Sequence, residues 1–314
     1  MMTDQRQYGI GNYLLFFLDQ IGVSEQLKKW KDYQGLVNQD PNWDREFQKS
    51  IKDTAQIRAD FDGFRHGANR DHSAHPEVTN MLRTHPELFV DTEATRDMKI
   101  SGQSFSDTNI WFVQTSDTEK RLFCRQMLGI VHGACGVFLQ ALSRGQFCRG
   151  SIALGVGTDA LRFFGEEREE IFGPVLEQAH YLESKVSVYP RIVVEETFPR
   201  YIEGRLWNLN ELAVGTREYA TKQFENFYLN GMKDLISVDE DGCLILDYAG
   251  KNCSELFAGW FESERISRSE FYSKIIDLVI AERRRFAVHL KKPHIADKYF
   301  KLHRYLESNQ EFWI

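Results

Sequence analysis

Residues Tyr13 to Ser24 read YLLFFLDQIGVS, a continuous apolar run followed by an aspartate and a glycine. Six apolar residues in a row, bounded by turn formers, predict a strand buried on both faces. Ser24 begins a segment of helix formers that continues to Lys31, which predicts a helix capped by that serine. In the order strand, glycine turn, helix, the backbone N–H groups of the helix start face the end of the strand, where an anion would be stabilised.

Outside this stretch the hydrophobic pattern predicts further strands and helices. Residues 100–114 (ISGQSFSDTNIWFVQ) form two strand-like halves around the turn formers Ser106-Asp107-Thr108, which predicts a hairpin. Helices are expected over residues 122–142 and 171–186, and strands over 147–156 and 191–195. This order of elements predicts an α+β fold, in which helices cover a mixed sheet.

The flanking regions differ from this pattern. Residues 38–97 are polar and rich in loop formers, so we expect a long insertion with some helix. After residue 200, helical stretches at about 206–229 and 268–290 lie on either side of a hairpin, LISVDEDGCLILDY, with Asp241-Gly242 at its tip. We therefore expect a main domain over residues 1–200, with a helical and hairpin extension over residues 201–314 packed on it.

Composition excludes several classes of protein. Of the 314 residues, 42% are hydrophobic and 13% aromatic, too many for a disordered chain. The formal charge of −7 disfavours a general nucleic-acid binder. The apolar run at 13–18 is far too short to span a membrane and follows no basic leader, so we expect a cytoplasmic protein without membrane insertion.

Cysteine and histidine give no sign of a structural metal or disulfide framework. The five cysteines are an odd number and widely spaced, which favours core thiols. The histidines His66, His72, His75 and His85 lie in a stretch typical of a polar loop, without metal-ligand spacing. A P-loop NTPase is excluded, since the chain has no GxxxxGK[ST] motif.

Two aspartates occupy strand ends, where a core residue would be usual. Asp19 directly follows YLLFFL, and Asp107 lies at the predicted hairpin tip. On adjacent strands both carboxylates would meet at one edge of the sheet, where their repulsion favours Mg²⁺ or Mn²⁺ bound together with phosphate oxygens. A strand-terminal aspartate is also a common turn cap, so both interpretations stay open.

Three segments resemble motifs of the class III nucleotidyl cyclase family, in a shared register over about residues 10–200. They are DQIGVS (19–24), QSFSDT (103–108) and EIFGPVLEQAHYLES (170–184). The chain departs from the family where Gln103 replaces a lysine, Ser106 a glycine, Glu177 an asparagine and Tyr181 an arginine. RGSIALG (149–155) and YPRIVV (189–194) resemble the divergent bacterial branch that contains the Pycsar pyrimidine cyclases of anti-phage defence.

This resemblance implies a ferredoxin-like cyclase sheet and an enzyme that converts UTP to cyclic UMP and pyrophosphate. Cyclic CMP made from CTP is the alternative. Asp19, Gln20 and Asp107 would hold two Mn²⁺ or Mg²⁺ ions, and the backbone near Gly22 and Ser24 would cradle the β- and γ-phosphates. Family members build each active site across a homodimer, and their cyclic nucleotide acts on a downstream effector.

The remaining roles come from positions in the matched motifs. Gln103 and Glu170 fall where the family reads the base; a glutamine amide suits uracil or cytosine, while Glu170 is equally consistent with a solvated acid. Phe17 either stacks on the base or fills the core. Because Tyr181 cannot supply an arginine's charge, Arg149 and Arg191 are the candidate transition-state cations, and both are also compatible with ordinary surface arginines.

Two other functions are compatible with the sequence. Loss of the asparagine and arginine is expected in a catalytically silent homologue that binds a nucleotide as a regulator. A polymerase-like two-metal enzyme would share the carboxylates, but the negative charge argues against it. The glycine-rich helix at 122–142 is expected to pack either within the chain or against a second subunit.

Overall fold

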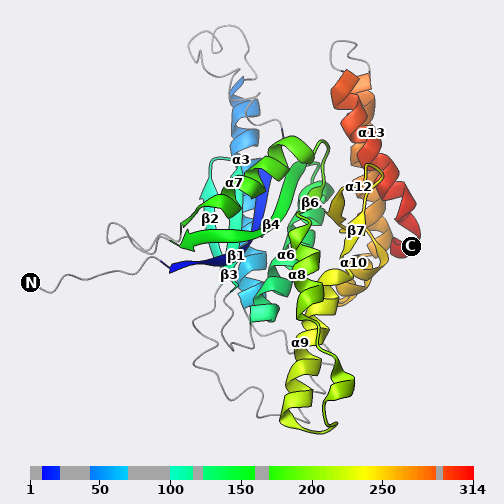
Figure 1. Ribbon diagram of the computed structural model, residues 1–314. Coiled ribbons are helices and arrows are strands. Elements are labelled where there is room, and N and C mark those ends of the chain that lie inside the picture. The colour runs from blue at the N-terminus through cyan, green and yellow to red at the C-terminus, as the bar shows by residue number, and fades with distance from the viewer. Residues whose placement is uncertain (1–8, 22–42, 70–99, 116–122, 160–169, 288–292) are drawn as a thin grey trace, which may run out of the picture.

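The computed structural model describes residues 9–21, 43–69, 100–115, 123–159, 170–287 and 293–314. One mixed sheet runs through the molecule (Figure 1). Neighbouring strands are antiparallel except for the parallel pair β4 and β6. The spatial order is β2 (Ser101–Phe105), β3 (Thr108–Gln114), β1 (Gly9–Gln20), β4 (Cys148–Asp159), β6 (Ile192–Val194), β8 (Leu244–Leu246) and β7 (Ile236–Val238), with β5 (Ile171–Phe172) on β4.

The predicted apolar strand is the centre of this sheet. β1 lies between β3 and β4, and its side chains alternate between two buried faces. Leu14, Phe16 and Leu18 belong to the larger core, whereas Leu15 and Phe17 belong to a smaller core beneath α7 (Pro174–Tyr181). The α+β prediction is confirmed, and so are the hairpin at 100–114 and the strand after residue 147.

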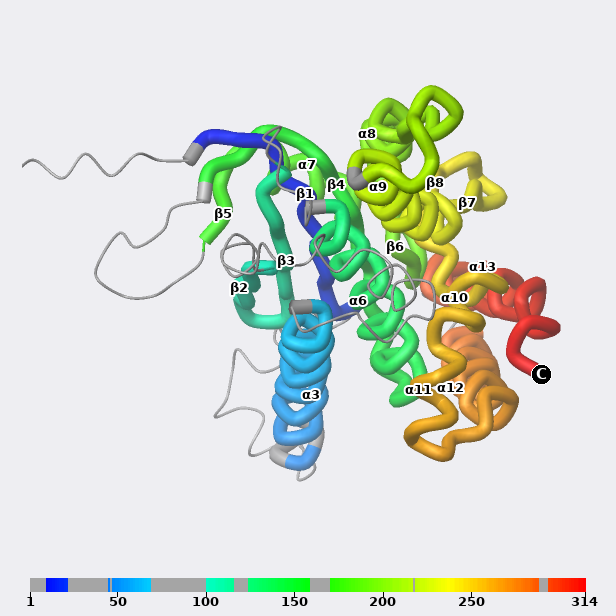
Figure 2. The backbone as a smooth tube through the Cα atoms, turned by 90° about the horizontal axis from the view of Figure 1, so that it is seen from below, coloured from blue at the N-terminus to red at the C-terminus, as the bar shows by residue number. Residues whose placement is uncertain are grey.

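Two long helices cover the face of the larger core. Figure 2 shows α3 (Trp43–Asn69) and α6 (Phe123–Ser143) side by side beneath the sheet. The glycines of α6 allow close packing, because a Cβ on Gly136 would clash with the Phe64 ring of α3, and one on Gly133 would lie 2.7 Å from the Trp111 ring of β3. The glycines of α6 therefore serve packing within the chain, which decides between the two alternatives expected for them.

α6 is also long and apolar enough to cross a membrane, by length and composition alone. In the described part of the chain it is the single helix of this kind, and 89% of its apolar window is buried inside the protein. The apolar side chains of α6 thus pack against the sheet and α3.

The description of residues 38–97 as an insertion needs correction. α3 occupies 43–69, and its Ile57 and Phe61 are buried in the larger core. Phe61 stacks on Phe16 of β1 at 6.0 Å between ring centroids and lies 4.2 Å from the Trp111 ring. The helix is thus an integral layer of the fold.

The C-terminal region extends the same sheet. β8 pairs with β6 through Val193 and Ile245, and the predicted hairpin tip is confirmed by Gly242 at φ +81°. Tyr248 packs on Phe138 of α6 at 4.6 Å between centroids, so the two regions share one core. The helices of this region are α8 (Thr197–Arg205), α9 (Arg217–Lys233), α10 (Lys251–Leu256), α11 (Ala258–Glu264), α12 (Arg268–Ala287) and α13 (Pro293–Ser308).

Two predicted helix boundaries were wrong. The helix expected from residue 171 begins at Pro174, because residues 171–172 pair with β4, and it continues as a π-helical turn over Leu182–Val186. The helix expected from residue 206 begins at 217, where the side chain of Thr216 caps it by accepting from Tyr219 N at 3.2 Å. The predicted helix 24–31 lies outside the described residues.

Candidate active site

The two predicted aspartates meet at one edge of the sheet. Asp19 near the end of β1 is paired with Thr108 on β3 and with Arg149 on β4. The Thr108 hydroxyl donates to Asp19 Oδ1 at 2.9 Å. Because Asp107 directly precedes Thr108, the second carboxylate-bearing residue lies beside the first.

A tight turn fixes Asp107 in this position. Phe105 and Thr108 are paired, which leaves Ser106 and Asp107 as a two-residue connection between β2 and β3. Ser106 has φ +49°, a left-handed conformation that is uncommon for a residue with a Cβ. This turn therefore carries a steric cost that a glycine at position 106 would avoid.

The surroundings of Asp19 raise the pKa of its carboxyl group. Burial is the largest cause raising its pKa, and the charge of Asp107 raises the pKa further. The Thr108 hydrogen bond and the nearby charges of Arg149 and His180 act in the opposite direction but do not cancel the rise.

Arg149 is shared between two carboxylates. Its Nη2 lies 2.7 Å from Glu183 Oε1 and 3.9 Å from Asp19 Oδ2. The Glu183 side chain is only 3% exposed, and burial raises its pKa to about 7 against the lowering effect of Arg149. The charges of Asp19 and Asp107 raise it too, so the Glu183–Arg149 pair has two further acidic side chains in its surroundings.

These residues fit a divalent cation bound together with a phosphate. In the described ranges no three His, Cys, Asp or Glu side chains gather as a metal cluster. Asp19 and Asp107 are two carboxylates, hard oxygen donors of the kind that Mg²⁺ and Mn²⁺ prefer, and two protein ligands would leave coordination positions for phosphate oxygens and water.

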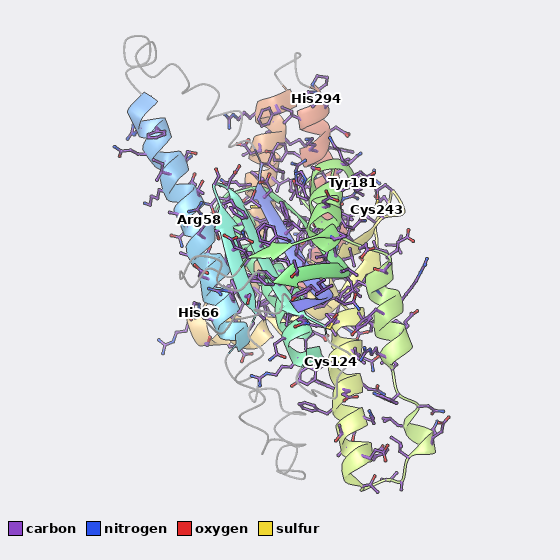
Figure 3. All side chains as sticks on the ribbon, turned by 60° about the vertical axis from the view of Figure 1, so that its left-hand side comes forward. Arg58, His66, Cys124, Tyr181, Cys243 and His294 are labelled. Atoms are coloured by element: carbon purple, nitrogen blue, oxygen red, sulfur yellow. The ribbon has the colours of Figure 1, made fainter. Side chains whose placement is uncertain are left out.

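The two predicted base-reading residues are linked through the backbone. Gln103 Oε1 accepts a long hydrogen bond at 3.4 Å from the backbone N of Ile171, the residue that follows Glu170. Glu177 is exposed on α7, and Tyr181 at the end of that helix is 55% exposed. Figure 3 labels Tyr181.

Two predicted residues have other environments. Phe17 is 6% exposed and packs in the smaller core, with His180 5.7 Å away between ring centroids, so its face is not free to stack on a base. Arg191 is 1% exposed, and its guanidinium binds Asp239 and Asp241 in the β7–β8 connection. We therefore revise both roles: Phe17 fills the core, and Arg191 holds the C-terminal hairpin.

The residues expected next to Asp19 are described only in part. The Gln20 side chain accepts a hydrogen bond from the Thr54 hydroxyl of α3 at 3.2 Å. Gly22 and Ser24, predicted to cradle phosphates, lie outside the described residues.

Three site residues were missed at the sequence level: Thr108, His180 and Glu183. A usable signal existed for Glu183. Val175, Ala179 and Leu182 recur at helical spacing, and Glu183 follows on the same face, so an acid was to be expected in a buried position. An acid at a buried position indicates a functional or ion-paired group.

Comparisons with known proteins give remote likenesses. No protein-family model and no curated protein matches the chain. Among solved structures, the catalytic core of a rhodopsin-guanylyl cyclase with converted specificity, in complex with ATPalphaS, has a TM-score of 0.38 at 8% identity, over 64% of this chain and 87% of that one. The adenylyl cyclase CyaB from P. aeruginosa has 0.34 at 13%, over 63% and 83%.

The guanylyl cyclase Cya2 has a TM-score of 0.32 at 10% identity, over 60% of this chain and 77% of that one. All three are adenylyl or guanylyl cyclases. At these identities and TM-scores the likeness is too distant to assign chemistry, which has to come from this chain's own residues.

Proposed function

We propose that this protein is a two-metal nucleotidyl cyclase, which converts UTP to 3′,5′-cyclic UMP and pyrophosphate. The observation that carries this proposal is the meeting of Asp19 and Asp107 at one sheet edge, with a raised pKa at Asp19. Such a pair is costly to keep near the protein interior unless a cation joins it.

The roles of the chain's residues follow from this geometry. Asp19 and Asp107 would hold the ions, which supply Lewis-acid activation of the ribose 3′-hydroxyl and the α-phosphate. Thr108 orients Asp19 through its hydroxyl hydrogen bond. Arg149, whose Nη2 lies 3.9 Å from Asp19 Oδ2, is the cation best located to stabilise charge developing on the phosphate, whereas Arg191 is 1% exposed and its guanidinium is held against Asp239 and Asp241.

The base would be read by Gln103 and Glu170. Gln103 is bonded to the backbone of the residue that follows Glu170, which supports a common role, because a glutamine amide and a carboxylate together offer N–H donors and several acceptors. Such a pair suits the imide N–H of uracil. Since an amide presents either its donor or its acceptor, cytosine is the alternative base, and cyclic CMP the alternative product.

The wider biological role rests on the resemblance to the Pycsar branch. In this role the protein would be a homodimeric enzyme in the cytoplasm, and its cyclic nucleotide would activate an effector during anti-phage defence. A silent regulatory homologue is the competing function, and the exposed Glu177 and Tyr181 at the family's asparagine and arginine positions favour it. The pair of site carboxylates favours the enzyme.

The test is product analysis from an equal mixture of ATP, GTP, CTP and UTP with Mn²⁺. We expect mass spectrometry to detect cyclic UMP from the wild-type protein and none from Asp107→Ala. Cyclic CMP alone would change the substrate to CTP. Nucleotide binding without any cyclic product would favour the silent homologue, and full activity of Asp107→Ala would remove the metal assignment.

A further inference from the structure

Helix α3 contacts both segments that carry the site carboxylates. Thr54 and Arg58 are one helical turn apart, so they lie on the same face of the helix. Thr54 donates to the side chain of Gln20, the neighbour of Asp19, at 3.2 Å. The Arg58 guanidinium donates to the backbone carbonyl of Ser106, the neighbour of Asp107 (Figure 3).

The helix is a rigid support for these contacts. Ile57, between Thr54 and Arg58 in the sequence, is 2% exposed, and Phe61 is 1% exposed. Both belong to the larger core together with Phe16 of β1. Core packing therefore holds the backbone of this part of α3 in place relative to the strand ends that carry Asp19 and Asp107.

The turn on which Arg58 acts is strained. Ser106 has φ +49°, a left-handed conformation that is disfavoured for a residue with a Cβ. Turns of this kind persist when surrounding contacts over-determine them. The charge-assisted hydrogen bond from Arg58 to the Ser106 carbonyl is such a contact, and it acts on the residue next to Asp107.

We propose that Arg58 is a positioning residue that holds the Ser106-Asp107 turn in the conformation needed for metal binding, and so compensates for the absence of a glycine at position 106. The inference rests on the proposed metal site. It assigns α3, which the sequence pattern had placed in an insertion, a direct part in organising that site. Arg58 acts through the turn and does not itself contact the metal or the nucleotide.

The test measures metal binding without turnover. Mn²⁺ is titrated by electron paramagnetic resonance into the full chain with 3′-deoxy-UTP, which lacks the attacking hydroxyl. We expect Arg58→Met to raise the Mn²⁺ dissociation constant about tenfold, the scale of one charge-assisted hydrogen bond. Arg45→Met removes an exposed arginine from the same helix and should leave the constant unchanged.

Rescue by glycine separates positioning from general damage. Ser106→Gly removes the steric cost of the positive φ, so Arg58→Met/Ser106→Gly should regain an affinity close to that of the wild type. Ser104→Gly is the matched control, because Ser104 lies in β2 without a positive φ and should give no rescue. Wild-type affinity in Arg58→Met, or a loss that Ser106→Gly does not recover, would overturn the proposal.

Two further measurements complete the design. If circular dichroism shows that Arg58→Met is unfolded, Arg58→Gln replaces it, and a folded Arg58→Gln with wild-type Mn²⁺ affinity overturns the proposal. Asp107→Ala gives the reference for a lost site. If the wild type binds Mn²⁺ no better than this variant, the metal site and its positioning residue both fail, whereas an unaffected Arg58 variant removes the positioning role alone.

Discussion

Arg149, near the start of β4, and Arg191, directly before β6, occupy corresponding positions but differ in their effect on the neighbouring acidic side chains. Gly150 of β4 pairs with Ile192 of β6, so Arg149 and Arg191 each directly precede a paired residue. Arg191 binds Asp239 and Asp241, and a nitrogen of its guanidinium also donates to Val186 O at 2.8 Å. Consistent with this pairing, the pKa of Asp241 is lowered to about 2.

The acidic side chains beside Arg149 have pKa values above their ordinary ones. Glu183 has a pKa raised to about 7 and Asp19 a raised pKa, even though the guanidinium lies within ion-pair distance of both. Each arginine contacts two acidic side chains, but the pKa of Asp241 is lowered beside Arg191, whereas burial raises the pKa values of Glu183 and Asp19 beside Arg149. This difference predicts that the Arg191 cluster stabilises the fold more than the Arg149 cluster does, and that the acids beside Arg149 would be stabilised by the cation of the proposed function.

The largest expected effect is on the free energy of unfolding when Arg191 is replaced. Arg191→Met would leave Asp239 and Asp241 without their buried partner, and should lower the free energy of unfolding by about 3 to 5 kcal/mol. Arg149→Met should cost only about 1 kcal/mol, because Glu183 can take up a proton near neutral pH. Urea denaturation at pH 7 measures both, and equal losses would contradict the contrast.

The next effect is a pH dependence of stability that comes from Glu183, the partner of Arg149. Glu183 binds its proton more tightly in the folded state, with a pKa of about 7 against an ordinary value of 4.5. The wild type should therefore lose up to about 3 kcal/mol of stability as pH rises from 4.5 to 7, relative to Glu183→Gln. Urea denaturation of both proteins between pH 4.5 and 8 checks this, and parallel stability curves would show that the pKa of Glu183 is not raised in the folded protein.

A smaller effect of opposite sign is expected at Asp241. Its pKa is lowered from 3.8 to about 2, so its contribution is present above pH 3.8 and disappears as pH falls to 2. The side chain is 44% exposed, and solvent screening reduces the contribution to about 1 kcal/mol. The stability difference between wild type and Asp241→Asn should shrink over this range, and a constant difference would show that the Arg191 pair does not set the pKa.

Much of the central sheet was predictable because its signals are local. The YLLFFL run, the Ser-Asp turn and the apolar spacing of α6 each specify their element within about twenty residues. The meeting of Asp19 and Asp107 followed from the strand ends alone, once β1 and β3 were taken to be neighbours.

Other features depend on contacts that no local pattern reveals. α3 has only a narrow apolar stripe in a charged sequence, and it is fixed by Phe16 and Trp111 from distant strands. Arg191 was assigned to the site because its strand borders it, but its partner Asp239 lies 48 residues further along the chain. Side-chain direction across a sheet is decided by such pairings.

One pair of variants tests the central claim most directly: Asp19→Asn and Asp239→Asn, assayed for pyrophosphate release from UTP with Mn²⁺ and for thermal unfolding. Asp19→Asn should lower the rate by about two to three orders of magnitude, while its unfolding midpoint stays equal to or above that of the wild type. Asp239→Asn should unfold at a lower temperature but keep its rate per folded molecule. A wild-type rate in Asp19→Asn would contradict the account.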